Sequence, residues 1–171
     1  MAAHDAMRPG PVVLQSPFVM GQEPAPPPSS STMPLDALAT AFGARTLPHA
    51  EWTHVAHLRV GAWHVHHHCA DAALTMLRTG IRALNDAHGT PNTATSGYHE
   101  TITVAYVRLI AAFLAACTDD EPLDGRVARM LAGPLGERRV LFRYWSEALL
   151  MSERARRQWV PPDRAPLDDR R

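Results

Sequence analysis

Apolar residues recur at intervals of three and four along most of the chain after residue 34, and this spacing limits the fold more than any other feature. In the segment before Gly89 the apolar positions are Ala73, Leu74, Leu77, Ile81 and Leu84. Such spacing forms one apolar stripe on a helix, whereas a half-buried strand would alternate apolar and polar residues. No segment shows that alternation. The sequence therefore predicts an all-α fold, a single-domain helical bundle of about five to six helices.

The helix boundaries follow from residues that start and stop helices. We expect helices over residues 34–43, 50–68, 71–88, 97–117, 123–132 and 136–158. Thr32, Asp71 and Ser96 are the expected caps at three of the starts, and Gly89 and the pair Gly133-Pro134 are expected stops.

Composition divides the chain into three parts. Residues 1–33 are rich in proline and serine, which cannot bury a core, so we expect a disordered leader. The helical bundle then spans 34–158, and 159–171 is expected to be a disordered tail because Pro161-Pro162 stop the last helix.

Charge and hydropathy narrow the possible surroundings and partners. The formal net charge is +0, so no overall positive field favours nucleic acid. No apolar run approaches the roughly 18 residues that span a bilayer, and the first residues lack the order of a signal peptide. We expect a cytoplasmic protein without nucleic-acid or membrane partners. Its two cysteines, Cys69 and Cys117, are expected to be reduced.

Histidines concentrate in one helix of the predicted bundle. Seven of the 10 histidines fall between His49 and His68. At about 100° per residue, His54, His57, His64 and His68 share one side of that helix. His64 is too far along the axis to join His54 and His57, but with His68 it is a candidate for a second, weaker site.

The chemistry of these residues suggests a metal centre. His54 and His57 lie about one helical turn apart and can converge on one ion. His99 lies on another helix and is expected to face its apolar side, with Glu100 next to it. We predict a transition metal (Zn, Fe, Ni or Cu) bound by His54, His57 and His99, because neutral imidazole suits these ions. Glu100 is then a fourth ligand or an acid–base group beside the metal.

Three functions remain open at this level. A metal with an open position would acidify a bound water and support hydrolysis or group transfer on a small-molecule substrate. A closed ligand shell would instead make a non-catalytic binding module or sensor. Without metal, the same histidines are hydrogen-bonded core residues, and the domain is structural or binds a small ligand or a partner. Glu100 is then a carboxylate at a helix start, where it interacts with the helix dipole.

Two short motifs carry a resemblance. Trp52-Thr53-His54-x-x-His57-Leu58, followed about forty residues on by Gly97-Tyr98-His99-Glu100-Thr101, resembles a group of small bacterial helical proteins of unassigned activity. The likeness covers roughly residues 38–115 and implies a shared helical domain. The architecture is also similar to metal-binding four-helix bundles of the DinB type, although the histidine spacing differs from their three-histidine pattern.

Overall fold

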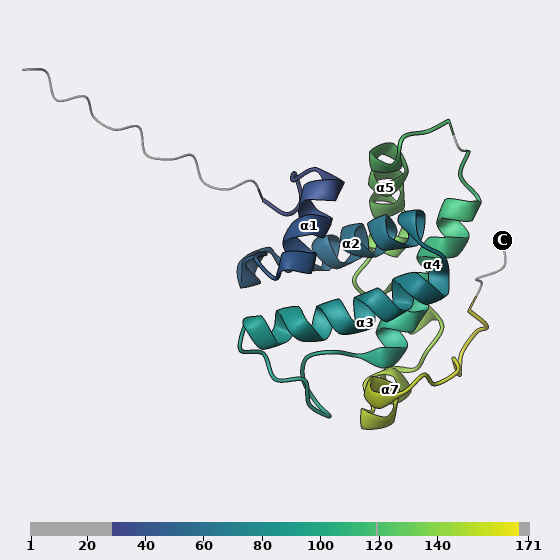
Figure 1. The fold of residues 1–171 in the computed structure, drawn as a ribbon. Coiled ribbons are helices and arrows are strands. Elements are labelled where there is room, and N and C mark those ends of the chain that lie inside the picture. Colours follow the sequence, from purple (N-terminus) through teal and green to yellow (C-terminus); the bar gives the residue numbers. More distant parts are fainter. Residues whose placement is uncertain (1–28, 119, 168–171) are drawn as a thin grey trace, which may run out of the picture.

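A computed structural model describes residues 29–118 and 120–167, and these residues form helices and loops without a β-strand (Figure 1). The prediction of an all-α bundle is confirmed. The α-helices are α1 (Leu35–Ala44), α2 (His54–His67), α3 (Ala70–Ala87), α4 (Glu100–Ala115), α5 (Leu123–Ala132), α6 (Glu147–Leu150) and α7 (Glu153–Arg157). Three single-turn 3₁₀ helices join them: η1 (His49–Glu51), η2 (Pro134–Gly136) and η3 (Val140–Arg143).

Helix α4 is the centre of the bundle. It packs against α2, α3 and α7, while α5 and α7 lie at opposite ends of the molecule (Figure 1). Its sequence explains the position, because most of its residues are apolar and several faces are buried at once. The buried apolar residues are Val104, Ala105, Val107, Leu109 and Ile110. Ile102, Tyr106 and Phe113, also apolar or aromatic residues of α4, are only half-buried.

The helix starts differ from the predicted caps. Helix α2 begins at His54, because the Thr53 hydroxyl accepts the amide of Ala56 at 3.2 Å. Helix α4 begins at Glu100 with His99 as its cap, and not Ser96. Gly89 has a φ of 68°, the left-handed conformation expected just after a helix end.

The predicted single helix over 136–158 is wrong. This segment contains η3, α6 and α7, separated by turns. Ser146 and Ser152 each start a new helix, because their hydroxyls accept the amides of Leu149 at 3.3 Å and Ala155 at 3.1 Å. The apolar spacing resembled one long helix, but these two caps break it. The breaks bring the indole of Trp145 into the core, where it donates to the carbonyl of Val160 at 3.2 Å.

The domain also extends past both predicted boundaries. At the first boundary, the buried guanidinium of Arg59 donates to the carbonyls of Ser30 and Met33. At the second, Val160 is buried, and Asp163 accepts the amide of Ser146 at 2.7 Å. Residues 29–33 and 159–167 therefore belong to the folded unit. The rest of the predicted leader and tail, 1–28 and 168–171, lies outside the described residues.

Two further sequence expectations concern the cysteines and the membrane. Cys69 and Cys117 are both free thiols. None of the helices within the described ranges combines the length and the apolar character needed to cross a bilayer.

Candidate functional site

His54 lies at the start of α2 and faces the side of the bundle where η2 and α4 meet. Its ring contacts the ring of Tyr106 edge-on, with centroids 5.7 Å apart. Burial lowers the pKa of His54, and the nearby positive charge of Arg138 lowers it further. Its Nε2 is buried without a hydrogen-bond partner among the described residues. His54 is thus a neutral imidazole packed against an aromatic ring.

His57 lies one turn further along α2 and stacks on the indole of Trp52. The two ring centroids are 3.7 Å apart, and the planes differ by 28°. The Nδ1 of His57 is 2.7 Å from the carbonyl of Thr53, which can only accept, so Nδ1 carries the proton. The lone pair is therefore on Nε2. Surrounding protein atoms lower the pKa of His57, although the residue reaches the surface, so its neutral form is favoured at pH 7.

His99 is buried and uses both ring nitrogens inside the protein. Its Nε2 donates to the carbonyl of Leu150 in α6 at 2.9 Å. Its Nδ1 accepts the amide of Ile102 at 3.3 Å, which caps α4. The imidazole therefore joins the start of α4 to α6, and neither nitrogen is left for a metal.

The predicted metal centre is not assembled by this arrangement. His54 packs on Tyr106, His57 stacks on Trp52, and His99 is occupied by two hydrogen bonds. Across the described residues, no group of three or more His, Cys, Asp or Glu side chains is placed to hold a metal ion. Spacing along one helix does not ensure convergence, because each imidazole is oriented by a different neighbour.

The candidate second site at the end of α2 consists of His64 and His68. The ring centroids of His64 and His68 are 6.3 Å apart. The Nδ1 of buried His64 donates to the carbonyl of Val60 at 2.8 Å. Two imidazoles on one helix are below the number of ligands that a structural metal site uses.

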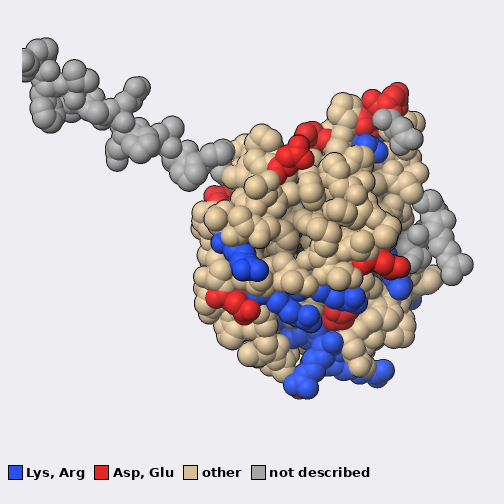
Figure 2. All heavy atoms as spheres, in the orientation of Figure 1, with Lys and Arg blue, Asp and Glu red and all other residues tan. Residues whose placement is uncertain are grey.

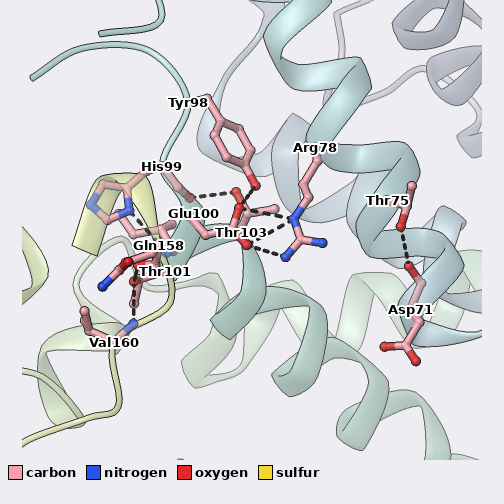
Figure 3. Close-up of polar contacts among 11 residues, drawn as sticks. Asp71, Thr75, Arg78, Tyr98, His99, Glu100, Thr101, Thr103, Gln158 and Val160 are labelled. Carbon is pink, nitrogen blue, oxygen red and sulfur yellow. Dashed lines mark hydrogen bonds and ion pairs between the residues drawn. The ribbon is translucent and has the colours of Figure 1, made fainter. Parts of the chain in front are cut away.

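Glu100 is held by an ion pair inside the bundle, not beside a metal. Its carboxylate receives two nitrogens of Arg78 from α3, with Nε at 3.0 Å from Oε1, and the hydroxyl of Tyr98 at 2.8 Å (Figure 3). Burial raises the pKa of Glu100, but hydrogen bonds from Arg78 and Tyr98 outweigh it, so the net shift is downward. A carboxylate held ionised in this way joins α3 to α4 and is poorly suited to exchange protons near neutral pH.

Thr101 completes the set of structural contacts in the second motif. It is fully buried, and its hydroxyl donates to the carbonyl of Gln158 at 2.9 Å and accepts the amide of Val160 at 3.1 Å (Figure 3). Three consecutive side chains, His99, Glu100 and Thr101, thus bind three different parts of the chain. The second motif is the point where α4 is joined to α3, α6 and the C-terminal segment.

The loop before α4 is organised by one asparagine. The side-chain oxygen of Asn92 accepts from Asn85 at 2.9 Å and from the amide of Tyr98 at 3.0 Å. Its side-chain nitrogen donates to Asp86 at 2.8 Å and to the carbonyl of Arg82 at 3.2 Å. All the hydrogen-bonding capacity of this amide is used. This segment, residues 88–99, which we name the polar loop, is therefore a rigid cover fixed to α3.

The two motifs meet at a cavity of about 380 Å³, which we name the His57 cavity. Its main lining residues are Trp52 and His57 from the first motif, Tyr98 and His99 from the second, and Met151 and Arg156 from the C-terminal helices. Sequence reasoning did not place Met151 or Arg156 at this site. Nothing in their local sequence distinguishes them, because they reach the cavity only through the turns that divide the C-terminal segment.

Comparison with known proteins gives no independent guide to this site. No protein-family model, curated protein or solved structure matches the chain.

The volume of the His57 cavity lies within the range of about 300–1,000 Å³ usual for small-molecule sites. Because both sequence motifs contribute to its lining, this cavity is the candidate site.

The buried imidazole of His99 should make the unfolding free energy depend on pH. Burial and the charge of Arg156 lower its pKa from 6.5 to about 4. The unfolded chain takes up a proton near pH 6.5 and the folded one does not, so the stability contributed by neutral His99 is complete above pH 6.5 and is lost as pH falls toward 4. Between pH 7 and 4.5, the wild type should lose about 2–3 kcal/mol more unfolding free energy than His99→Asn, whose side chain can still cap α4. Urea unfolding at both pH values measures this difference, and equal losses in the two proteins would contradict it.

Proposed function

We propose that this domain binds a small organic molecule in the His57 cavity. Two polar groups on its wall support the proposal. The Nε2 lone pair of His57 can accept a hydrogen bond, because Thr53 holds the proton on Nδ1. Trp52 carries a buried indole N–H that has no hydrogen-bond partner among the described residues. A buried donor without a partner costs about 1–3 kcal/mol.

The shape of the wall indicates what kind of molecule fits. Both faces of the Trp52 indole are covered, by His57 on one side and by Phe42, with centroids 5.2 Å apart, on the other. The indole therefore offers its edge to a ligand and not a stacking surface. Ile81, Ile102 and Met151 add apolar surface to the same lining. The ligand class is a compact molecule with an apolar body and one group that donates a hydrogen bond to His57.

The proposal concerns ligand binding, and the observation that carries it is the free acceptor position of His57 within a cavity built by both motifs. Of the functions left open by the sequence, small-ligand binding without metal is the one with a cavity and an acceptor to support it. Met151 is exposed at 47% and lies in the lining, so it gives a place to close the cavity by substitution without disturbing the core.

Fragment binding tests the proposal directly. Phenol, benzamide and cyclohexanol should produce saturable shifts of the Trp52 indole N–H resonance in two-dimensional NMR, with dissociation constants in the millimolar range expected for such small ligands. His57→Gln, which removes the ring Nε2, should weaken the fragment that binds best by about threefold to tenfold, since a hydrogen bond is worth about 0.5–1.5 kcal/mol net.

Two further variants make the result decisive. Met151→Trp should block the cavity and abolish the shifts, whereas His67→Gln, on an exposed position of the same helix, should leave binding unchanged. Thermal unfolding of each variant checks that the fold is intact. Absence of saturable shifts with all three fragments, or equal affinities in the wild type and His57→Gln, would reject the proposal.

A further inference from the structure

A second cavity, of about 310 Å³, lies on the other side of Tyr98 and Arg156, between α3, the polar loop and α7. We name it the arginine cavity. Its principal lining residues are Arg82, Asn92, Thr93, Tyr98, Arg156 and Arg157. Figure 2 shows basic side chains gathered at the end of the molecule that carries α7, with few acidic ones among them. The sequence alone does not bring Arg82, Arg156 and Arg157 together in one site.

Two of the three arginines are held in place without a carboxylate partner in the described part of the chain. The guanidinium of Arg82 lies over the ring of Tyr98, 4.1 Å from its centroid. Arg156 donates through Nη1 to the carbonyls of Gly97 at 3.0 Å and Tyr98 at 3.2 Å. These contacts fix the position of each guanidinium without an ion pair, although Arg82 is close enough to Glu100 to help lower the pKa of that carboxylate. Burial lowers the pKa of Arg156, which shows that its charge is partly removed from water.

Three acidic groups lie near this cavity, and two of them are paired with arginines. Glu153 pairs with Arg157 at 2.5 Å along α7. Asp86 accepts from Asn92, and Glu100 is bound by Arg78 on the inner side of Tyr98. The cavity still has an excess of positive charge, because Arg82 and Arg156 outnumber Asp86, the one nearby carboxylate that pairs with no arginine among the described residues. That excess favours an anionic ligand.

The polar loop adds a neutral hydrogen-bond donor. The Thr93 hydroxyl oxygen accepts the amide of Ser96 at 3.1 Å and that of Thr95 at 3.3 Å. With its oxygen used as an acceptor, the hydroxyl keeps its own proton to donate. Guanidinium groups that are fixed in position, together with a hydroxyl donor, match the oxygens of a phosphoryl group.

We propose that the arginine cavity is a binding site for the phosphoryl group of a small molecule, with Arg82, Arg156 and Thr93 as the principal donors. The site is distinct from the ligand position beside His57, although Tyr98 and Arg156 contribute to both linings. It goes beyond the proposed function because it names a charged group that the His57 cavity does not require.

NMR titration at constant ionic strength tests this proposal. Inorganic phosphate and glycerol 3-phosphate should both shift the amides of Thr93 and Ala94 saturably, and acetate should bind at least about fivefold more weakly because its two oxygens cannot engage all the donors that a phosphoryl group can. Agreement between the two phosphates shows that the phosphoryl group is recognised. If only glycerol 3-phosphate bound, contacts to the rest of that molecule would dominate, and the proposed recognition would be wrong.

Matched arginine variants supply the control. Arg82→Gln should weaken phosphate binding about fivefold or more, while Arg154→Gln, on α7 but outside this lining, should change it less than twofold. Both residues are exposed, so both variants should fold. His57→Gln should bind phosphate normally, which separates failure of this proposal from failure of the other. Shifts that follow ionic strength alone, or equal losses in the two arginine variants, would overturn it.

Discussion

Glu100→Ala should lower the free energy of unfolding by about 2–3 kcal/mol, because it leaves Arg78 and the hydroxyl of Tyr98 without their shared partner. The side chain of Glu100 is 10% exposed and that of Arg78 is 37% exposed. Arg78 can therefore turn partly toward water, which keeps the loss below that of a fully buried pair. Urea unfolding at pH 7 measures the change.

Two comparisons show whether Glu100 acts through this pair. Arg78→Ala combined with Glu100→Ala should cost less than the sum of the two single changes, because each single change already breaks the same interaction. Glu147→Ala is the matched control, since its pair with Arg139 spans 3.6 Å and both side chains are exposed by more than 60%, at 67% and 74%. It should cost less than about 1 kcal/mol. A loss at Glu100 no larger than at Glu147 would show that the buried pair does not hold α3 to α4.

Gly97→Ala is expected to be at least as damaging, with a loss of about 3 kcal/mol or more. Gly97 has a φ of 72°, which costs a residue with a Cβ about 1 kcal/mol. A Cβ at this position would also lie 2.7 Å from the side-chain oxygen of Asn92 and 2.7 Å from the carbonyl of Pro91. The asparagine would have to move, and its hydrogen bonds to Asn85 and Tyr98 would be lost. Urea unfolding and the Tyr98 amide resonance report the change.

Gly89→Ala separates the two causes. Gly89 has a nearly equal φ of 68°, but nothing lies within 4 Å of the Cβ that alanine would add. This variant should therefore lose only the conformational part, about 1 kcal/mol. The difference between the two variants measures the clash with the Asn92 loop. Similar losses in both would mean that the loop yields easily and is not the rigid cover described here.

The helical architecture could be predicted because its cause is local. Spacings such as Leu77, Ile81 and Leu84 specify a helix with one apolar face before any partner is known. The same reasoning failed over 136–158, where apolar spacing is equally regular. Two serine caps allow new helices to begin inside this segment. Each hydroxyl accepts a backbone amide that would otherwise have no partner at the start of a helix.

The sequence predicted that its two motifs come together. Both motifs do meet, and Trp52, His57, Tyr98 and His99 line one cavity. The expected convergence of His54, His57 and His99 on a metal is not what the geometry assembles. A helical spacing places side chains around an axis but does not say which nitrogen points where. The ring of His57 was turned toward Trp52 and that of His54 toward Tyr106 by packing.

Local sequence by itself determined the secondary structure of α1 to α5 and the segment that carries most histidines, because helix formation depends on neighbours three and four residues away. Only the tertiary structure decided what those residues do. His99 finds its acceptor in Leu150, which is 51 positions along the chain, and Thr101 finds its partner in Gln158, 57 positions along. Buried polar atoms must be paired, and their partners are supplied by whichever distant segment the packing brings near. His99, predicted to be a metal ligand, is therefore the cap of a helix, and His57 lines a cavity.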